Sequence, residues 1–253
     1  WSTGTGECLW AFEGHGKEVL LATFSPDGAL VLSASADGTA KLLGSQAGDC
    51  RLSLEGHGSD VYRAEFSPDG QRVVTASLDG TAKVWQIELP LCTPARHSAC
   101  TPSSTCGKCL FTLTGHFHSV KFAAFSWDGQ FVVTASDDRM AKVWSASTGE
   151  CIWTLTGHTD TVYTADFSRD GRLLVTTSED QTALIWSMKT GATLQRLEEH
   201  EEAVTWAEFS PDSQRLVTAS WDLTAKVWSP ETGECLATLE GHAAPVLYAA
   251  FSA

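Results

Sequence analysis

Short runs of β-branched and aromatic residues alternate along the chain with clusters of Ser, Pro, Asp and Gly. One such run, Val61–Phe66, favours an extended strand and leads into a Ser-Pro-Asp-Gly turn at residues 67–70. Pro presets φ in this turn and Gly supplies a positive φ. A second run, Arg72–Ser77, is followed by Asp79-Gly80, a two-residue hairpin signal, and by a third run at residues 81–85. The pattern therefore predicts three short antiparallel strands in succession.

The same sequence pattern recurs at a fixed period. The dipeptide Gly-His stands at residues 14–15, 56–57, 115–116, 157–158 and 241–242, with the degenerate copy Glu-His at 199–200. Successive marks are 42, 59, 42, 42 and 42 residues apart, so one interval carries 17 extra residues. The text VYRAEFSPDGQRVVTASLDGTAKVW of one unit returns as VTWAEFSPDSQRLVTASWDLTAKVW in another. A closing Cys-Leu-x-Thr-Leu type phrase, as at residues 151–155, predicts a fourth strand in each unit.

A unit of four short strands cannot bury both of its faces alone. Stacking such sheets face to face around an axis buries them, and this arrangement is a β-propeller. We therefore predict a single all-β domain over residues 1–253. Its repeat units are residues 14–55, 56–114 with an insertion over 86–106, 115–156, 157–198 and 199–240, with a partial blade from residues 1–13 and 241–253.

These features resemble the WD-repeat (WD40) family over nearly the whole chain. The matching features are the Gly-His mark, the Ser-x-Asp before the hairpin and the Trp that ends the third strand. The Asp of the family's name is replaced by Gln86, Ser145, Ser187 and Ser229, at a position that varies in the family, and Leu43 stands at the Trp position of the first unit.

The resemblance implies a hydrogen-bonded tetrad of Trp, Ser, His and Asp in each repeat, which satisfies polar groups that would be costly to bury unpaired. The first unit has His15, Ser35 and Asp37 but no indole. The residues carried over are His57, Ser77, Asp79 and Trp85; His116, Ser136, Asp138 and Trp144; His158, Ser178, Asp180 and Trp186; and His200, Ser220, Asp222 and Trp228.

The two ends of the chain raise the question of blade number. We expect residues 246–252 to form a first strand and residues 8–12 a last strand of one incomplete blade. A six-position ring would bring Trp1 close to His242, whereas an arc of a seven-bladed ring would leave an open wedge. Seven is the commoner number in the family, which favours the arc. The chain also begins at Trp1 and not at Met, which indicates processing or a piece of a longer protein.

Charge and composition narrow the range of partners. The 253 residues carry a formal charge of −14, with 31 acidic and 17 basic side chains. Phosphate binding needs clustered Lys and Arg, so nucleic acid is disfavoured as a partner, and so is an anionic membrane surface. No apolar run reaches the length of a spanning helix and no signal peptide is evident, so we expect neither membrane insertion nor secretion, and a cytoplasmic location.

Ser, His and Asp within one unit also suggest a hydrolase triad. An active site occurs once, however, and not at every 42nd residue, and no nucleophile elbow or phosphate-binding glycine loop accompanies these residues. We therefore predict no catalytic residues, no enzyme activity and no cofactor.

The eight cysteines form two groups. Five occupy one place in the predicted fourth strand, where Cys behaves as a small buried hydrophobe: Cys8, Cys50, Cys109, Cys151 and Cys235. Cys92, Cys100 and Cys106 lie in the insertion with His97, and the CxxC spacing of Cys106 and Cys109 is compatible with zinc. A disulfide and free thiols are the alternatives, and the lack of secretory features favours free thiols, so we predict no metal.

The family resemblance also indicates a binding face. Family members often engage partners through positions just after the first-strand Val and just before the hairpin Asp. The first set is Leu20, Tyr62, Lys121, Tyr163, Thr205 and Leu247, and the second is Ala36, Leu78, Asp137, Glu179 and Trp221. Aromatic residues carry much of the energy of interfaces. From these sets we select Tyr62, Leu78, Lys121, Asp137, Tyr163, Glu179 and Trp221 as partner-binding residues.

Two functional classes follow. The first is a non-catalytic scaffold or adaptor that binds other proteins or peptides within a multiprotein assembly. The alternative is a recognition domain of a larger enzyme or signalling protein whose chemistry lies outside these residues.

Overall fold

The computed structural model describes residues 1–88 and 107–252. Within these ranges the regular structure is entirely β, and it consists of five four-stranded antiparallel sheets. The strands predicted at Val61–Phe66 and Arg72–Ser77 are confirmed with the same bounds, and the third strand of that sheet lies one residue later than predicted, at Ala82–Gln86. No helix long and apolar enough to cross a membrane occurs in the described ranges.

Each sheet takes its four strands from one stretch of sequence. The first sheet contains β1 (Val19–Phe24), β2 (Leu30–Ser35), β3 (Ala40–Gly44) and β4 (Cys50–Leu54). The second contains β5 (Val61–Phe66), β6 (Arg72–Ser77), β7 (Ala82–Gln86) and β8 (Lys108–Leu113). The third contains β9 (Val120–Phe125), β10 (Phe131–Ser136), β11 (Met140–Ser145) and β12 (Cys151–Thr156). The fourth contains β13 (Val162–Phe167), β14 (Leu173–Ser178), β15 (Ala183–Ser187) and β16 (Thr193–Leu197). The fifth contains β17 (Val204–Phe209), β18 (Leu216–Ser220), β19 (Ala225–Trp228) and β20 (Cys235–Leu239).

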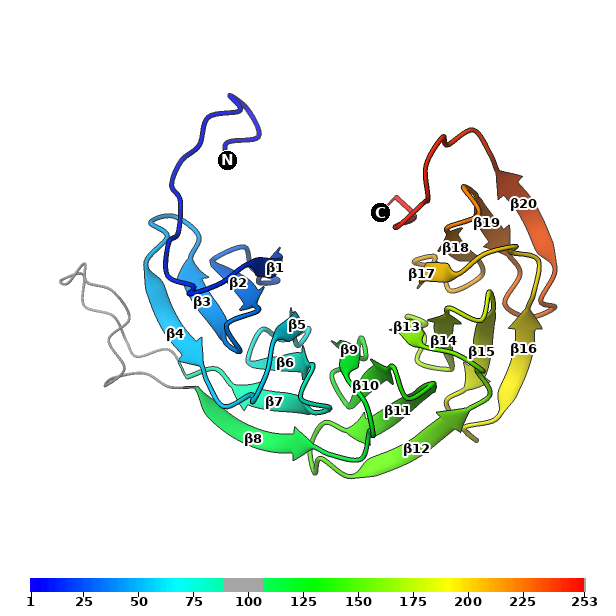
Figure 1. The fold of residues 1–253 in the computed structure, drawn as a ribbon, viewed down its shortest axis with the longest axis horizontal. Coiled ribbons are helices and arrows are strands. Elements are labelled where there is room, and N and C mark those ends of the chain that lie inside the picture. The colour runs from blue at the N-terminus through cyan, green and yellow to red at the C-terminus, as the bar shows by residue number, and fades with distance from the viewer. Residues whose placement is uncertain (89–106, 253) are drawn as a thin grey trace.

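The five sheets stand side by side along an arc, as the blades of a β-propeller do (Figure 1). In every blade the strands pair in sequence order. The first strands β1, β5, β9, β13 and β17 line the inside of the arc, and the fourth strands form its outer rim (Figure 1). This order follows from the short turns, which can join only neighbouring antiparallel strands.

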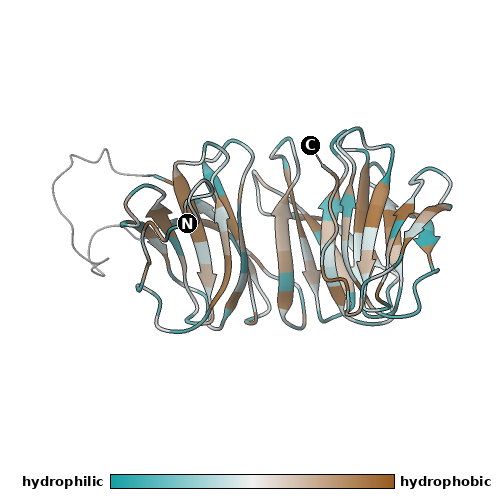
Figure 2. Cartoon of the chain, turned by 90° about the horizontal axis from the view of Figure 1, so that it is seen from above, coloured by the Kyte–Doolittle hydropathy of each residue, from teal (hydrophilic) through white to brown (hydrophobic). Residues whose placement is uncertain are grey.

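The hydrophobic core is divided among the spaces between neighbouring blades. One cluster joins the third and fourth blades, where Val143 and Leu155 pack with Phe167 and Trp186. Equivalent clusters join the other neighbouring pairs. Apolar residues follow the strands, and hydrophilic residues gather in the loops at both ends of the blades (Figure 2). Each blade is therefore stabilised mainly by its neighbours, as expected of a repeat protein.

The cysteine prediction is wrong in one respect. Cys109 and Cys151 begin fourth strands, but their side chains are exposed, and Cys235 is only partly buried. Cys8 is exposed and lies outside any strand. The physical reason is the position of the fourth strand at the outer rim of the arc, where no further strand covers it (Figure 1). The proposed zinc or disulfide residues Cys92, His97, Cys100 and Cys106 lie outside the described residues, as does most of the insertion.

The predicted terminal blade is also corrected. Residues 8–12 and 246–252 form no strand in the described ranges. A strand needs a neighbour to pair with, and the chain contains no middle strands for this blade. The C-terminal segment instead follows the fifth blade, where the Val246 N–H donates a hydrogen bond to the Ser220 carbonyl oxygen at 3.0 Å. The two termini lie on opposite sides of an opening in the arc (Figure 1), and whether the full ring has six or seven positions stays a prediction.

Candidate functional site

Every first strand contains a β-bulge directly after its first Val. In β5, Val61 pairs with Ser77 and Arg63 pairs with Ala76, so Tyr62 between them has no partner. An extra residue of this kind redirects its side chain away from the sheet, and bulges are common next to binding sites. The equivalent unpaired residues are Leu20, Lys121, Tyr163 and Thr205. Five of the predicted binding positions are therefore bulge residues.

Backbone hydrogen bonds bring the second predicted set to the same end of the blades. The Leu78 N–H donates to the Asp60 carbonyl oxygen at 3.0 Å, directly before β5. Asp137, Glu179 and Trp221 make the same bond in their own blades, as does Ala36 in the first. Both sets thus lie on one face of the arc, which we call the bulge face; its bulge residues are those named above, and its hairpin residues are Ala36, Leu78, Asp137, Glu179 and Trp221.

Lys121 connects the second and third blades on the bulge face. Its Nζ lies 4.5 Å from the centre of the Tyr62 ring, and 3.4 Å from Asp137 Oδ2. An ammonium over an aromatic face is attracted by the ring quadrupole, and the carboxylate adds an ion pair. All three side chains are partly exposed, so the ion pair of Lys121 with Asp137 contributes little to stability. It does hold the three side chains of this sector in one arrangement.

Tyr163 and Trp221 form a second group on the bulge face. Their ring centroids are 6.2 Å apart, and 43% of the Trp221 surface is exposed. Burial raises the pKa of Tyr163 to about 12, and Glu179, Asp160 and Asp137 contribute because their negative charges oppose the phenolate. This sector therefore combines exposed aromatic surface with a negative potential.

Thr205 does not contribute a free hydroxyl to the bulge face. Its Oγ1 lies 3.1 Å from the Val246 carbonyl oxygen and 3.3 Å from those of Ala219 and Leu247. The C-terminal segment therefore occupies the hydrogen-bonding capacity of Thr205.

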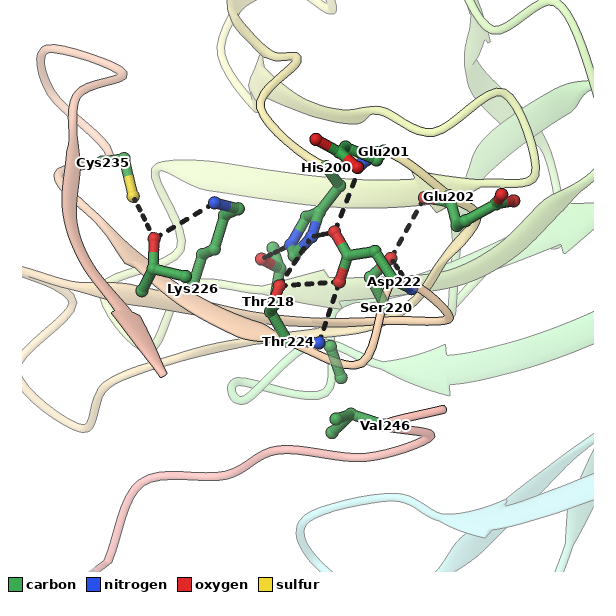
Figure 3. A network of polar contacts seen from close by, with 12 residues as sticks. His200, Glu201, Glu202, Thr218, Ser220, Asp222, Thr224, Lys226, Cys235 and Val246 are labelled. Atoms are coloured by element: carbon green, nitrogen blue, oxygen red, sulfur yellow. Dashed lines mark hydrogen bonds and ion pairs between the residues drawn. The ribbon is translucent and has the colours of Figure 1, made fainter. Parts of the chain in front are cut away.

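The predicted tetrad has a different hydroxyl from the one assigned. In the fifth blade His200 Nδ1 lies 2.6 Å from Asp222 Oδ2, and His200 Nε2 lies 2.7 Å from Thr218 Oγ1 (Figure 3). The Trp228 indole N–H donates to the same Thr218 Oγ1 at 2.8 Å. Ser220, the residue assigned to this role, does not contact the imidazole or the indole.

The same correction holds in the other blades that carry a Trp. The hydroxyls that join His to Trp belong to Thr75, Thr134 and Thr176, two residues before the predicted Ser77, Ser136 and Ser178. In the first blade His15 Nε2 meets Ser33 Oγ at 2.8 Å, and Leu43 replaces the indole donor as predicted. The recurrence of Thr or Ser at this strand position was the sequence signal for this role.

The assigned serines have another structural role. Ser77 Oγ accepts from the Asp79 N–H at 3.1 Å and donates to the Ser59 carbonyl oxygen at 3.2 Å. Because Ser77 ends β6, its side chain is level with the hairpin turn, whereas Thr75 lies further inside the strand, next to Trp85. The serine therefore fixes the turn, and the threonine connects the imidazole to the indole.

Protonation in the tetrad follows from its hydrogen bonds. Burial alone would raise the pKa of Asp79, but hydrogen bonds from Thr81, Gly58 and His57 outweigh it and lower the pKa to about 2. An ionised carboxylate only accepts, so His57 Nδ1 carries the proton toward Asp79, and Nε2 accepts from the Thr75 hydroxyl. Burial lowers the pKa of His57 despite this carboxylate, which keeps the imidazole neutral. Each buried donor of this tetrad then has an acceptor.

Asp, His and a hydroxyl joined in this order have the connectivity of a hydrolytic triad. The hydroxyl is not available to a substrate, however, because Thr75, Thr134, Thr176 and Thr218 are each 0% exposed and accept an indole N–H. These residues therefore serve the fold. Among the described residues, no group of three or more His, Cys, Asp or Glu side chains is arranged to hold a metal ion.

Comparison with models of protein families identifies the repeats. The family model described as WD domain, G-beta repeat, matches residues 6–42, 48–86, 107–145, 149–187 and 191–229. These five matches cover most of the chain. The comparison with curated proteins found no match.

Proposed function

Because the chain belongs to the WD-repeat family, we propose that it is a protein-binding scaffold or adaptor that holds a partner protein against its bulge face. WD-repeat domains generally mediate protein–protein interactions and are typically non-catalytic. We further propose that the chain acts within a multiprotein assembly.

The observation that carries this proposal is the composition of the bulge face. Tyr62, Tyr163 and Trp221 are presented there on bulges and hairpins, next to Lys121 and Glu179. Exposed aromatic side chains with polar neighbours are the residues that supply most of the binding energy in protein interfaces. The fold does not require particular residues at these positions, because the repeats differ there while the His, the Asp and a hydroxyl of the tetrad recur in every blade.

The charge of the Tyr163 sector favours a basic segment in the partner. Glu179, Asp160 and Asp137 surround this ring with negative charge, which raises the Tyr163 pKa after the larger effect of burial. Positive charge on a partner would speed its association with this sector, and partners of the wrong charge would be repelled.

The test compares two double variants as bait. The chain is immobilised, cell extract is passed over it, and retained proteins are identified by mass spectrometry. We expect the double variant Tyr62→Ala with Trp221→Ala to retain at least tenfold less of these proteins than the parent chain does. The matched control, Leu194→Ala with Leu236→Ala, removes comparable exposed apolar surface from the outer rim and should retain it.

Both variants must unfold at the temperature of the parent chain, within a few degrees, for the comparison to count. Equal retention by the two variants would show that the bulge face is not the binding surface.

A further inference from the structure

The inner strands carry a second feature at the end opposite the bulge face. A cavity of about 550 Å³ is lined by the later residues of β5, β9, β13 and β17 and by the turns that follow them, including Pro68, Trp127 and Pro211. Because the bulge residues start these strands and the turns end them, the cavity and the bulge face lie at opposite ends. The volume is in the range of pockets that take a small molecule or inserted side chains.

Aromatic rings form much of the cavity wall. The Arg63 guanidinium lies 4.1 Å from the centre of the Phe122 ring and 5.5 Å from that of Trp206. Trp206 packs in turn against Tyr248 of the C-terminal segment in a tilted arrangement, with ring centroids 4.7 Å apart. Arg63 thus connects the second blade to the third and the fifth, and its guanidinium lies against the rings of Phe122 and Trp206.

Three carboxyl groups share this cavity. Arg63 Nη2 pairs with Glu65 Oε2 at 3.0 Å. The other two accept neutral hydrogen bonds: Asp166 Oδ2 from the Phe209 N–H and Glu208 Oε2 from the Tyr248 hydroxyl, each at 3.2 Å. Among the described residues neither Asp166 nor Glu208 forms an ion pair.

The remaining charged group at the cavity is Arg169. Its guanidinium lies 5.3 Å from the centre of the Trp127 ring, among the turns, and makes no ion pair within the described ranges. Burial raises the pKa of Asp166 to about 7, and the charges of Glu208 and Glu65 contribute. Burial also raises the pKa of Glu65, although Arg63 opposes this. The cavity lining carries three carboxyl groups against two guanidinium groups, an excess of one negative charge when all are ionised, which a bound cation would relieve.

The cavity also contains a donor with no acceptor. Within the described residues, the indole Nε1 of Trp206 is buried without a hydrogen-bond partner, and Trp206 lines the cavity. A buried N–H left unpaired is costly, so an occupant that supplies an acceptor is favoured. A simple polyamine has positive charge but no acceptor, whereas a peptide has a cationic side chain and a carbonyl oxygen together.

We propose that this cavity binds a basic side chain of a partner polypeptide, with its cationic group between Asp166 and Glu208. Its methylene groups lie against the apolar lining of the cavity, and a backbone carbonyl oxygen of the same residue accepts from Trp206 Nε1. This site is separate from the bulge face, so a partner protein could engage both ends of the inner strands.

The test is isothermal titration of the intact chain with the tripeptide acetyl-Gly-Arg-Gly-amide. The matched probe replaces Arg by citrulline, which has the same shape without the charge, and spermidine serves as a cation without a carbonyl acceptor. We expect the Arg peptide to bind at least tenfold more tightly than either probe. Its affinity should rise about tenfold from pH 6 to pH 8, because Asp166 must lose its proton.

Variants separate this site from the bulge face. Asp166→Asn and Glu208→Gln retain the hydrogen bonds from Phe209 and Tyr248 but remove the charge, and each should weaken the Arg peptide at least tenfold. Asp166→Asn should also flatten the pH dependence, and Glu179→Gln on the bulge face should change neither. Thermal unfolding checks that the variants fold.

Three results would overturn the proposal. These are equal binding of the Arg and citrulline peptides or of spermidine, loss of binding in Glu179→Gln instead of Asp166→Asn, and no heat of binding at peptide concentrations up to about 5 mM, the weak limit of specific affinity. None of these results bears on capture of a partner by Tyr62 and Trp221.

Discussion

Replacing Thr134 by Val tests the corrected tetrad in the central blade. Thr134 is 0% exposed, and its Oγ1 lies 2.8 Å from His116 Nε2 and accepts from the Trp144 indole N–H at 2.9 Å. Val has nearly the same shape but leaves both of these buried groups without a partner. An orphaned buried polar group costs about 1–3 kcal/mol, and the new methyl group recovers less than about 1 kcal/mol. We expect the free energy of unfolding to fall by about 2–4 kcal/mol.

The matched variant is Thr134→Ser. It keeps the hydroxyl and removes one buried methyl group, so its cost should be about 1 kcal/mol. Both are measured by urea denaturation, followed by circular dichroism and by Trp fluorescence, because coincident transitions show that the blades unfold together. In the first blade Ser33→Ala orphans only the imidazole of His15, since Leu43 replaces the indole, and should cost less than Thr134→Val.

Equal losses of stability in Thr134→Val and Thr134→Ser would refute the reasoning. Such a result would mean that the hydroxyl contributes no more than its methyl group, and that the short distances to His116 and Trp144 do not reflect energetically important hydrogen bonds.

Three further predictions concern the tetrads and the hairpin turns. Trp144→Ala or Asp138→Ala should lower the free energy of unfolding by about 2–4 kcal/mol, and a thermal midpoint unchanged within about a degree would contradict this. The pKa of Asp79 and that of Asp222 are lowered to about 2, so their contribution to stability is present above about pH 4 and should be lost as the pH falls toward 2; thermal unfolding from pH 6 to pH 2 measures it. Gly80→Ala should cost about 1 kcal/mol, because Gly80 has a φ of 81°, and urea denaturation would detect no change if this conformation carried no strain.

Local patterns predicted the repeated parts of the fold well. Strands such as Val61–Phe66 depend on alternating apolar residues and on turn residues, both of which are visible in the amino-acid sequence. The choice of Ser77 over Thr75 failed because both are hydroxyl residues of one strand, and only the side-chain positions show which one lies beside Trp85. Burial of the rim cysteines failed because the sequence alone does not show that the fourth strand lacks an outer neighbour.

The candidate site was predicted in part. The bulge that presents Tyr62 leaves no mark in the sequence except its position after Val61, and contacts such as that of Lys121 with Tyr62 join residues that are far apart in the chain. The cavity was missed, although charged residues at Arg63 and Glu65 in a predicted strand were a usable signal. A charge that faces a central channel looks like any solvated side chain until the blades are assembled.

A comparison of the first strands shows where the repeats keep a residue and where they vary. Val, Ala and Phe recur at the positions of Val61, Ala64 and Phe66 in all five blades, and Val61 and Ala64 are almost fully buried. Between them the sequence changes from blade to blade. The position of Tyr62 is taken by Leu20, Lys121, Tyr163 and Thr205, and the position of Glu65 by Thr23, Ala124, Asp166 and Glu208.

In the blades that follow another blade, the constant residues pack between blades and meet the same environment each time, whereas Val19 and Phe24 of the first blade are exposed. The variable ones lie at the bulge face or at the cavity end of the strands, where side chains from different blades together form one surface. Selection for folding alone would allow these positions to vary at random, yet they collect aromatic rings at one end and unpaired carboxylates at the other. Binding at both ends of the inner strands accounts for that difference, and the two sets of variants proposed above measure each end independently.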